Sequence, residues 1–296
     1  MLFLKFRVTV MEKCNLCPRK CNVDRSLQKG FCGTNLEILI ARAAPHYWEE
    51  PCISGQKGSG AIFFGGCNLR CCYCQNAKIS RGAGKPHTVG QLADVFENLQ
   101  KQGVHNINLV TPTHYTNKIV SALDIFTPDI PVVWNSGGYD SVEAIKLLEG
   151  RVNIFLPDFK YANADIAKKY SAAEDYPAVA INAIKQMLKQ TGKAKLDSDG
   201  IMQKGIIIRH LVLPDNTKHS IKALKLLFDN FGNDVYYSIM AQYTPMHNTP
   251  YKELCRTLTQ QEYDEVLNAV EQLGIEYGYT QELEAIGESF IPDFEI

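Results

Sequence analysis

The sequence predicts an α/β protein in which parallel strands are joined by helices, preceded by a small cysteine-rich module. Strand-like apolar runs alternate along the chain with stretches of helical period, and candidate functional residues follow the ends of several of these runs. Eight of the ten cysteines lie in two tight groups. Parallel strands with crossover helices form a barrel-like or a doubly wound sheet, and in both the functional residues lie at the carboxyl ends of the strands.

The N-terminal segment carries one of the two cysteine groups and shows neither helical nor strand periodicity, which predicts a compact module organised by metal. Proline and glycine residues between 38 and 60 break regular structure and indicate a connector that ends near Ser59. We therefore expect a cysteine-rich module with its connector over residues 1–58, and a core domain over residues 59–296.

The core domain is expected to contain six strands, at residues 61–64, 107–110, 132–134, 152–156, 206–213 and 235–241. Thr88 is a candidate N-cap of the first helix between them, and Gly103 a candidate terminator. Ser141 and Gly150 bracket a second helix, and the turn residues within 195–203 predict a hairpin-like excursion before the fifth strand.

The composition is that of a globular protein, with 296 residues, 45% hydrophobic and 21% charged side chains. The 31 basic and 32 acidic residues leave a net charge of −1, which argues against nucleic-acid or anionic-membrane partners. The N-terminus lacks the features of a leader peptide, and no apolar run approaches the ~20 residues of a membrane span. We expect a cytoplasmic location, where cysteines are reduced thiols or metal ligands.

The loop after the first core strand holds three cysteines at C-x3-C-x2-C spacing, namely Cys67, Cys71 and Cys74. In a cubane iron–sulfur cluster, three thiolates leave one iron without a protein ligand. That iron can take the amino and carboxylate groups of S-adenosylmethionine (SAM), which brings the sulfonium to the cluster electron, and homolysis then gives a 5′-deoxyadenosyl radical. A structural zinc loop is the alternative, but it needs a fourth nearby ligand, and Cys72 directly follows Cys71.

The string Cys67-x3-Cys71-x-Tyr73-Cys74 resembles the signature of the radical SAM superfamily, including the aromatic residue before the third cysteine. The longer segment 59–76 resembles the uncharacterised proteins related to pyruvate formate-lyase activating enzymes. This resemblance covers most of the chain. It implies a partial (β/α)6 barrel, a [4Fe-4S] cluster, SAM, and an electron donor such as flavodoxin or ferredoxin.

The resemblance also implies residues of a SAM pocket. Tyr73 would lie against the adenine, and Asp158-Phe-Lys160 at the end of the fourth strand looks like the Asp-x-Lys of the activating enzymes. A solvated strand end is the alternative for this pair. Arg209 is a charge inside an apolar strand and needs a buried partner. The SAM carboxylate and an acidic side chain on a neighbouring strand both qualify, and the resemblance favours SAM.

Other polar residues also follow predicted strands. Asn135 precedes two glycines that let the backbone approach the methionine or ribose of SAM, although a plain turn fits as well. His247 weakly resembles a histidine near SAM in the activating enzymes, with a surface-loop histidine as the alternative. Where related enzymes use Gly-Gly-Glu to bind the SAM amino group, this chain has Thr113 and His114, which either replace that contact, face the substrate, or form a cap and a packed histidine.

The N-terminal cysteines supply four soft ligands, enough for a tetrahedral zinc site or a second iron–sulfur cluster. They are Cys14, Cys17, Cys21 and Cys32. Their spacing departs from the bacterial ferredoxin run, and we favour zinc while keeping an auxiliary cluster as the alternative.

The function predicted from these residues is that of an oxidoreductase that cleaves SAM reductively and abstracts hydrogen from a substrate. The resemblance names a glycine of a partner enzyme as that substrate, although the missing Gly-Gly-Glu weakens this assignment. Modification of another peptide or of a small molecule by the same radical is the alternative. A non-enzymatic electron carrier would complete its cluster with protein ligands, and the missing fourth cysteine near Cys67 argues against that class.

Overall fold

The structure, a computed structural model, describes residues 13–245, 249–283, 292 and 294. Its strands are β1 (Ile38–His46), β2 (Ser59–Phe64), β3 (Lys85–His87), β4 (Ile107–Val110), β5 (Val132–Ser136), β6 (Ile154–Pro157), β7 (Lys195–Leu196), β8 (Met202–Leu211), β9 (Tyr236–Met240) and β10 (Gly278–Thr280). Its helices are α1 (Pro51–Ser54), α2 (Ala77–Ser80), α3 (Val89–Lys101), the 3-10 turn η1 (Thr113–Tyr115), α4 (Thr116–Ile125), α5 (Val142–Leu147), α6 (Ala164–Ser171), α7 (Tyr176–Thr191), α8 (Thr217–Phe231), the 3-10 turn η2 (Lys252–Cys255) and α9 (Gln260–Leu273).

The six expected strands are all present and form one parallel series. In space they follow the order β2, β4, β5, β6, β8 and β9, which is also their order along the chain. β10 extends this series in parallel, whereas β1 and β3 join the other edge in antiparallel orientation. In the described part of the chain, the path of paired strands ends at β10 and β3 without closing. The predicted α/β class and partial barrel are therefore confirmed.

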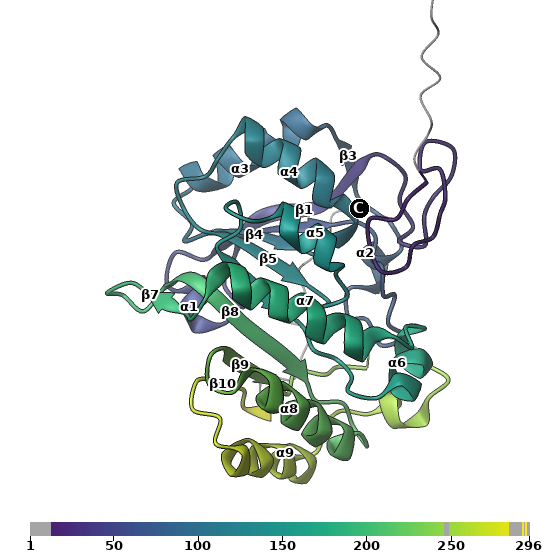
Figure 1. Ribbon diagram of the computed structural model, residues 1–296, viewed down its shortest axis with the longest axis vertical. Helices are drawn as coiled ribbons and strands as arrows, with labels where there is room; N and C mark the ends of the chain where they lie inside the picture. The colour runs from purple at the N-terminus through teal and green to yellow at the C-terminus, as the bar shows by residue number, and fades with distance from the viewer. Residues whose placement is uncertain (1–12, 246–248, 284–291, 293, 295–296) are drawn as a thin grey trace, which may run out of the picture.

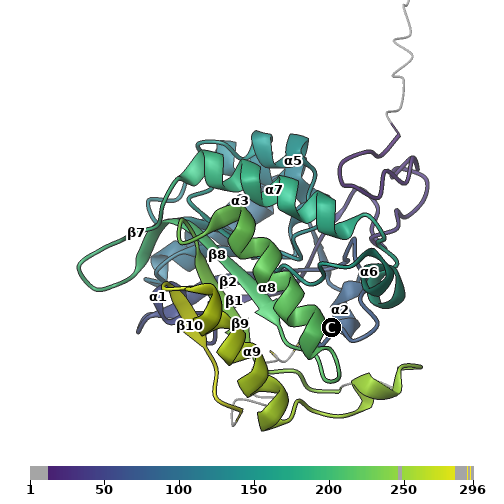
Figure 2. The same cartoon turned by 60° about the horizontal axis from the view of Figure 1, so that its bottom comes forward.

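The helices between the strands cover the outer side of the curved sheet. Figures 1 and 2 show α3, α4, α5, α7, α8 and α9 following one another along it, and helix pairs α3 and α4, α5 and α7, and α8 and α9 are in contact. Side chains of alternate strand residues fill the space beneath them because successive residues of a strand point to opposite faces. Leu109, Trp134, Phe155 and Ile208 belong to this outer core and are fully buried.

The local signals read from the sequence explain several element boundaries. The Thr88 hydroxyl accepts the main-chain N–H of Gln91, whose side chain in turn caps Thr88, and α3 begins there as expected. Ser141 accepts the N–H of Ala144 and starts α5 in the same way. The predicted hairpin is present, because β7 pairs in antiparallel orientation with the beginning of β8.

Strand β1 lies in the segment that the sequence predicted to be an irregular connector. Pro45 is tolerated because β3 pairs only with residues 38–40 of β1, so the missing N–H of the proline removes no ladder bond on that side. β1 pairs with β2 along most of its length, from Ile40 to His46. The domain boundary at residue 58 stays a prediction. β1, which precedes the boundary, pairs with β2, which follows it.

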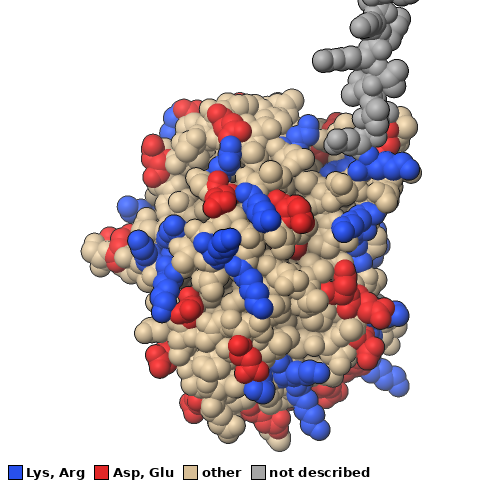
Figure 3. All heavy atoms as spheres, in the orientation of Figure 1, with Lys and Arg blue, Asp and Glu red and all other residues tan. Residues whose placement is uncertain are grey.

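Acidic and basic side chains are interspersed on the face of the molecule that Figure 3 shows, in keeping with the near-zero net charge. Over the described ranges, each helix falls short of the length and hydrophobicity that a bilayer crossing requires.

Two glycines with similar backbone angles provide a matched test of the loop after β5. Gly138 has φ +75°, and a Cβ there would collide with the main-chain oxygen of Asp158, whereas Gly150 has φ +76° and open space around it. Gly150→Ala should lower the free energy of unfolding by about 1–2 kcal/mol from backbone strain alone. Gly138→Ala should cost about 1–3 kcal/mol more because of the collision. Urea denaturation measures both, and equal losses would contradict the tight packing of this loop.

Candidate functional site

A cavity of about 220 Å³ lies at the carboxyl ends of the parallel strands. Each of the six strands contributes lining residues from its carboxyl end or the loop that follows, as expected for this class of fold. The cavity brings together the predicted site residues of the core domain, except one. Its lining includes Cys67, Cys71, Tyr73, Cys74, Asn135, Asp158, Lys160 and Arg209. The remaining candidate, His247, lies outside the described residues.

The cysteine loop follows β2 directly and places three thiols beside one another. Burial, followed by the nearby thiols of Cys67 and Cys71, raises the pKa of Cys74 to about 12. Burial and the Cys71 thiol likewise raise the pKa of Cys67. Cys72 does not line the cavity, and its thiol forms a hydrogen bond with Thr249 instead. The three cysteines of the motif thus face the cavity while the fourth points elsewhere, as its adjacency to Cys71 predicted.

Tyr73 lines the cavity but is anchored among other tyrosines. Its ring meets those of Tyr170 and Tyr243 edge-on, at centroid distances of 6.0 and 6.3 Å. Its hydroxyl lies 2.7 Å from the hydroxyl of Tyr161. The ring is therefore fixed by packing and by a hydrogen bond, and its contact with adenine stays a prediction.

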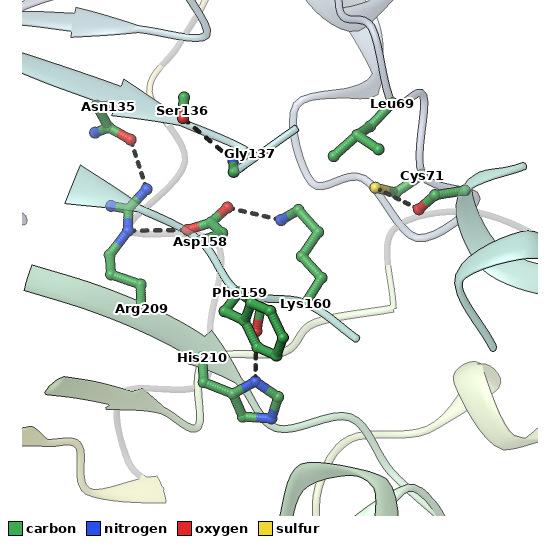
Figure 4. A network of polar contacts seen from close by, with 12 residues as sticks. Leu69, Cys71, Asn135, Ser136, Gly137, Asp158, Phe159, Lys160, Arg209 and His210 are labelled. Atoms are coloured by element: carbon green, nitrogen blue, oxygen red, sulfur yellow. Dashed lines mark hydrogen bonds and ion pairs between the residues drawn. The ribbon is translucent and has the colours of Figure 1, made fainter. Parts of the chain in front are cut away.

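Arg209 is the centre of a buried polar network on the inner face of the sheet (Figure 4). Its guanidinium donates to Asp158 Oδ1 and to Glu49 Oε2, both at 3.0 Å, and to Asn135 Oδ1 at 2.5 Å. Asn135 in turn donates to the other oxygen of Glu49, at 3.1 Å. The acidic partner that the sequence left open for Arg209 is thus present on the neighbouring strand, and a second one comes from the loop after β1.

Lys160 extends this network toward the cysteine loop. Its ammonium lies 2.7 Å from Asp158 Oδ2, and Figure 4 shows Arg209, Asp158 and Lys160 in a row across from Leu69 and Cys71. Burial alone would raise the pKa of Asp158, but the charges of Lys160 and Arg209 outweigh it and hold that pKa below its usual range. Only 17% of the Asp158 side chain and 17% of the Lys160 side chain is exposed, so a solvated strand end does not describe this pair.

Glu49 is the site residue that the sequence reasoning missed. It lies just before α1 and accepts hydrogen bonds from Asn108, Asn135 and Arg209. The next residue, Glu50, is also buried, and burial raises its pKa. No periodicity marks either residue. The sequence signal that points to such carboxylates is Arg209 itself, because an arginine inside an apolar strand needs acidic partners.

Thr113 and His114 occupy structural positions rather than the cavity lining. Thr113 donates to Asp140 at 2.6 Å, and His114 Nε2 lies 2.8 Å from the carbonyl oxygen of Gly65. Burial lowers the pKa of His114 to about 4, so the imidazole is neutral near pH 7. The packed-histidine alternative therefore describes this residue. Thr111 lines the cavity instead, with φ +59°, an uncommon conformation for a β-branched residue.

The N-terminal cysteines gather in a loop-rich module that packs against the cysteine loop. The Cys21 and Cys32 sulfurs both approach Gly30, and the Cys17 thiol interacts electrostatically with those of Cys14 and Cys32. Burial raises the pKa of Cys17 to about 11. No three Cys, His, Asp or Glu side chains among the described residues already stand as a formed site for one metal ion. The module contacts the core loop directly, since Cys67 N–H donates to the Cys32 carbonyl at 3.1 Å.

Comparison with known proteins places this site in a family. The family model of the radical SAM superfamily matches residues 61–227, which include the cysteine loop and five of the six parallel strands. This chain belongs to the radical SAM superfamily. It is therefore a radical SAM enzyme, and the family implies a [4Fe-4S] cluster and SAM as its cofactors.

Individual proteins of known sequence or structure are similar to this chain. An uncharacterized protein of Methanocaldococcus jannaschii is 28% identical over 282 residues, which cover 91% of this chain and 78% of that protein. A radical SAM methyltransferase from Sphaerobacter thermophilus superposes with a TM-score of 0.53 at 12% identity, over 75% of this chain and 65% of that one. SuiB from Streptococcus suis bound to S-adenosylmethionine gives 0.50 at 12%, over 78% and 51%. The chain thus spans less than two thirds of the length of these two solved proteins.

The buried Arg209 network should contribute much more to stability than an exposed ion pair. Arg209→Gln leaves Glu49 and Asp158 without their shared cation and should lower the free energy of unfolding by about 3–5 kcal/mol. Arg151→Gln is the control, because the exposed pair with Asp124 should contribute about 0–1 kcal/mol. Chemical denaturation of both variants gives the comparison, and similar small losses would show that the buried network is not coupled.

Proposed function

We propose that this radical SAM enzyme holds its cluster through Cys67, Cys71 and Cys74, cleaves SAM reductively and abstracts hydrogen from a substrate. One observation carries the proposal: the three thiols of a single loop and the charged row of Lys160, Asp158 and Arg209 line the same cavity. A thiolate set with one unligated iron and a pocket for a zwitterionic amino acid are the two parts that SAM chemistry requires.

The donor set fits a [4Fe-4S] cluster. Three thiols face one cavity, and Lys160 lies close enough to lower the pKa of both Cys67 and Cys74 against the dominant effect of burial. Cys67, Cys71 and Cys74 would hold the cluster, which when bound would supply the electron for reductive cleavage of the C5′–S bond of SAM to methionine and a 5′-deoxyadenosyl radical. The chain would orient the two cofactors within this cavity, whose charged side chains Asp158 and Lys160 are mostly buried.

The charged row supports a role in binding the methionine part of SAM. Lys160 lies across from the cysteine loop and is available to a carboxylate group at the cluster, with Asp158 keeping the ammonium in place. Arg209 already donates to three side chains, so we propose that it acts by fixing Asp158 and Asn135 toward the cavity. Tyr73 remains our candidate for contact with the adenine, and His247, which lies outside the described residues, remains a candidate for contact with SAM.

The same radical chemistry can act on several classes of substrate. A glycine of a glycyl-radical enzyme, another peptide, and a small molecule are all compatible with the same radical, and an electron donor such as flavodoxin or ferredoxin supplies the reducing equivalent. An electron carrier without catalysis is disfavoured because the cysteine motif supplies three ligands and Cys72 points away from the cavity.

Anaerobic incubation of the reconstituted protein with SAM and dithionite tests the function directly. We expect 5′-deoxyadenosine and methionine to form, because uncoupled cleavage needs the cluster and SAM but no substrate. A reconstituted protein that holds four irons and sulfides yet produces neither compound would overturn the proposal.

The ligand assignment makes a sharp prediction for four neighbouring cysteines. Cys67→Ala, Cys71→Ala and Cys74→Ala should each reduce SAM cleavage to background, because each removes one of the three thiolates that hold the cluster. Cys72→Ala is the matched control and should keep both iron content and activity. Iron and sulfide analysis with 5′-deoxyadenosine quantification measures the effect, and a Cys72 variant that alone loses its cluster would reassign the ligands.

We further propose that Cys14, Cys17, Cys21 and Cys32 bind a second metal, with zinc favoured over an auxiliary cluster. The mutual influence of their thiols and the loop-rich structure around them support a metal-organised module. A closed four-thiolate site would hold the module in the conformation in which the Cys32 carbonyl accepts from Cys67.

Metal analysis of a variant lacking Cys67, Cys71 and Cys74 separates the two sites. We expect about one zinc per chain, because the N-terminal thiolates form a complete set on their own. Residual iron with sulfide would replace zinc by an auxiliary cluster. A variant that binds neither metal, while remaining folded by circular dichroism, would contradict the second site.

A further inference from the structure

We propose that a chain of three hydroxyl groups, on Tyr73, Tyr161 and Ser171, ends on the sulfur of Cys71 and raises the reduction potential of the cluster. This inference rests on the proposed function, since it treats Cys71 as a cluster ligand. Ser171 and Tyr161 act as positioning residues, which tune the cluster without being its ligands.

The three hydroxyls and the sulfur form a continuous hydrogen-bonded chain. Tyr73 and Tyr161 hydroxyls are 2.7 Å apart, and the Tyr161 hydroxyl lies 2.7 Å from Ser171 Oγ. Ser171 Oγ donates to Cys71 Sγ at 2.9 Å. The exposed fractions of Tyr73, Tyr161 and Ser171 are 9%, 3% and 2%, so water hardly competes for these bonds.

Ligation of iron fixes the direction of every hydrogen bond in the chain. A thiolate at Cys71 has no proton and can only accept, and each hydroxyl has a single proton to donate. Ser171 therefore donates to Cys71, Tyr161 donates to Ser171, and Tyr73 donates to Tyr161.

The chain is held in place by contacts from three directions. Ser171 is the last residue of α6, and its carbonyl accepts from Arg19 of the N-terminal module at 2.7 Å. The main-chain N–H of Cys72 donates to the carbonyl of Tyr170, also at the end of α6, at 2.9 Å. The Tyr161 ring packs edge-on against Tyr176 at 5.3 Å. The hydroxyl of Ser171 is thus presented to the cysteine loop by fixed backbone.

Cys71 differs in this respect from the other two cysteines of the motif. The sulfur of Cys67 accepts the main-chain N–H of Leu69 at 3.3 Å, and that of Cys74 interacts with the main chain of Asn76. Cys71 instead accepts a side-chain hydroxyl that a single substitution removes. A donor on a ligand sulfur stabilises the extra negative charge of the reduced cluster, which raises its potential. Tyr161 and Tyr73 polarise the Ser171 hydroxyl and strengthen this effect.

Potentiometric titration of the full-length reconstituted protein, followed by electron paramagnetic resonance of the reduced cluster, tests the inference. Ser171→Ala should move the midpoint potential to a more negative value, and Tyr161→Phe should move it the same way by less, because the direct donor remains. Ser171→Thr keeps a hydroxyl and should restore the potential toward that of the parent protein. Tyr243→Phe is the matched control: its ring touches Tyr73, but its hydroxyl donates to the Leu254 carbonyl and lies outside the chain.

The outcomes separate this inference from the proposed function. A parent protein without bound iron and sulfide overturns the ligand assignment itself. A loaded parent protein whose potential is unchanged in both Ser171→Ala and Tyr161→Phe overturns only the hydroxyl chain. If Ser171→Ala does not retain iron, Tyr161→Phe decides, and a potential equal to that of Tyr243→Phe contradicts the inference.

Discussion

The pairing of Arg209 with Glu49 and Asp158 is the constraint on which the site depends. A guanidinium inside a sheet is costly unless its charge and donors are satisfied, and here two carboxylates and one amide satisfy them. These partners come from the loop after β1, the end of β5 and the end of β6. Because the Arg209 side chain binds all three partners, it fixes the two strand ends and the loop relative to one another. It thereby also fixes the charged wall of the cavity.

The alternation of strand residues explains why these polar groups meet. Ile154 and Leu156 point inward and pack in a small core with Cys52 and Ile53 of α1, and Asp158 continues the same face two residues later. The inner face of the sheet is thus apolar near the amino ends of the strands, where α1 packs against it, and polar near their carboxyl ends. The same polarity places the cysteine loop, which directly follows β2, beside the charged row.

The features that could be predicted from the sequence are those with a local signal. The six parallel strands and the start of α3 at Thr88 could be predicted because apolar runs and capping residues act within a few positions. β1 could not, because Pro45 and the proline and glycines that follow it obscure the strand pattern, and β10 has only three residues, too few for a periodic signal. The motif cysteines could be predicted from their spacing. The roles of Glu49 and Ser171 could not, because they depend on where the ends of β1 and α6 lie relative to the site.

The cysteine loop itself shows how far such long-range contacts reach. Arg19 donates to the carbonyl of Asn68 at 2.7 Å, inside the motif, and to the carbonyl of Ser171 at the end of α6. One side chain of the N-terminal module therefore binds both the loop that presents the thiols and the helix end that presents a hydroxyl to Cys71. The guanidinium connects the cysteine loop to the end of α6, so the N-terminal module helps to position the Ser171 hydroxyl relative to the sulfur of Cys71.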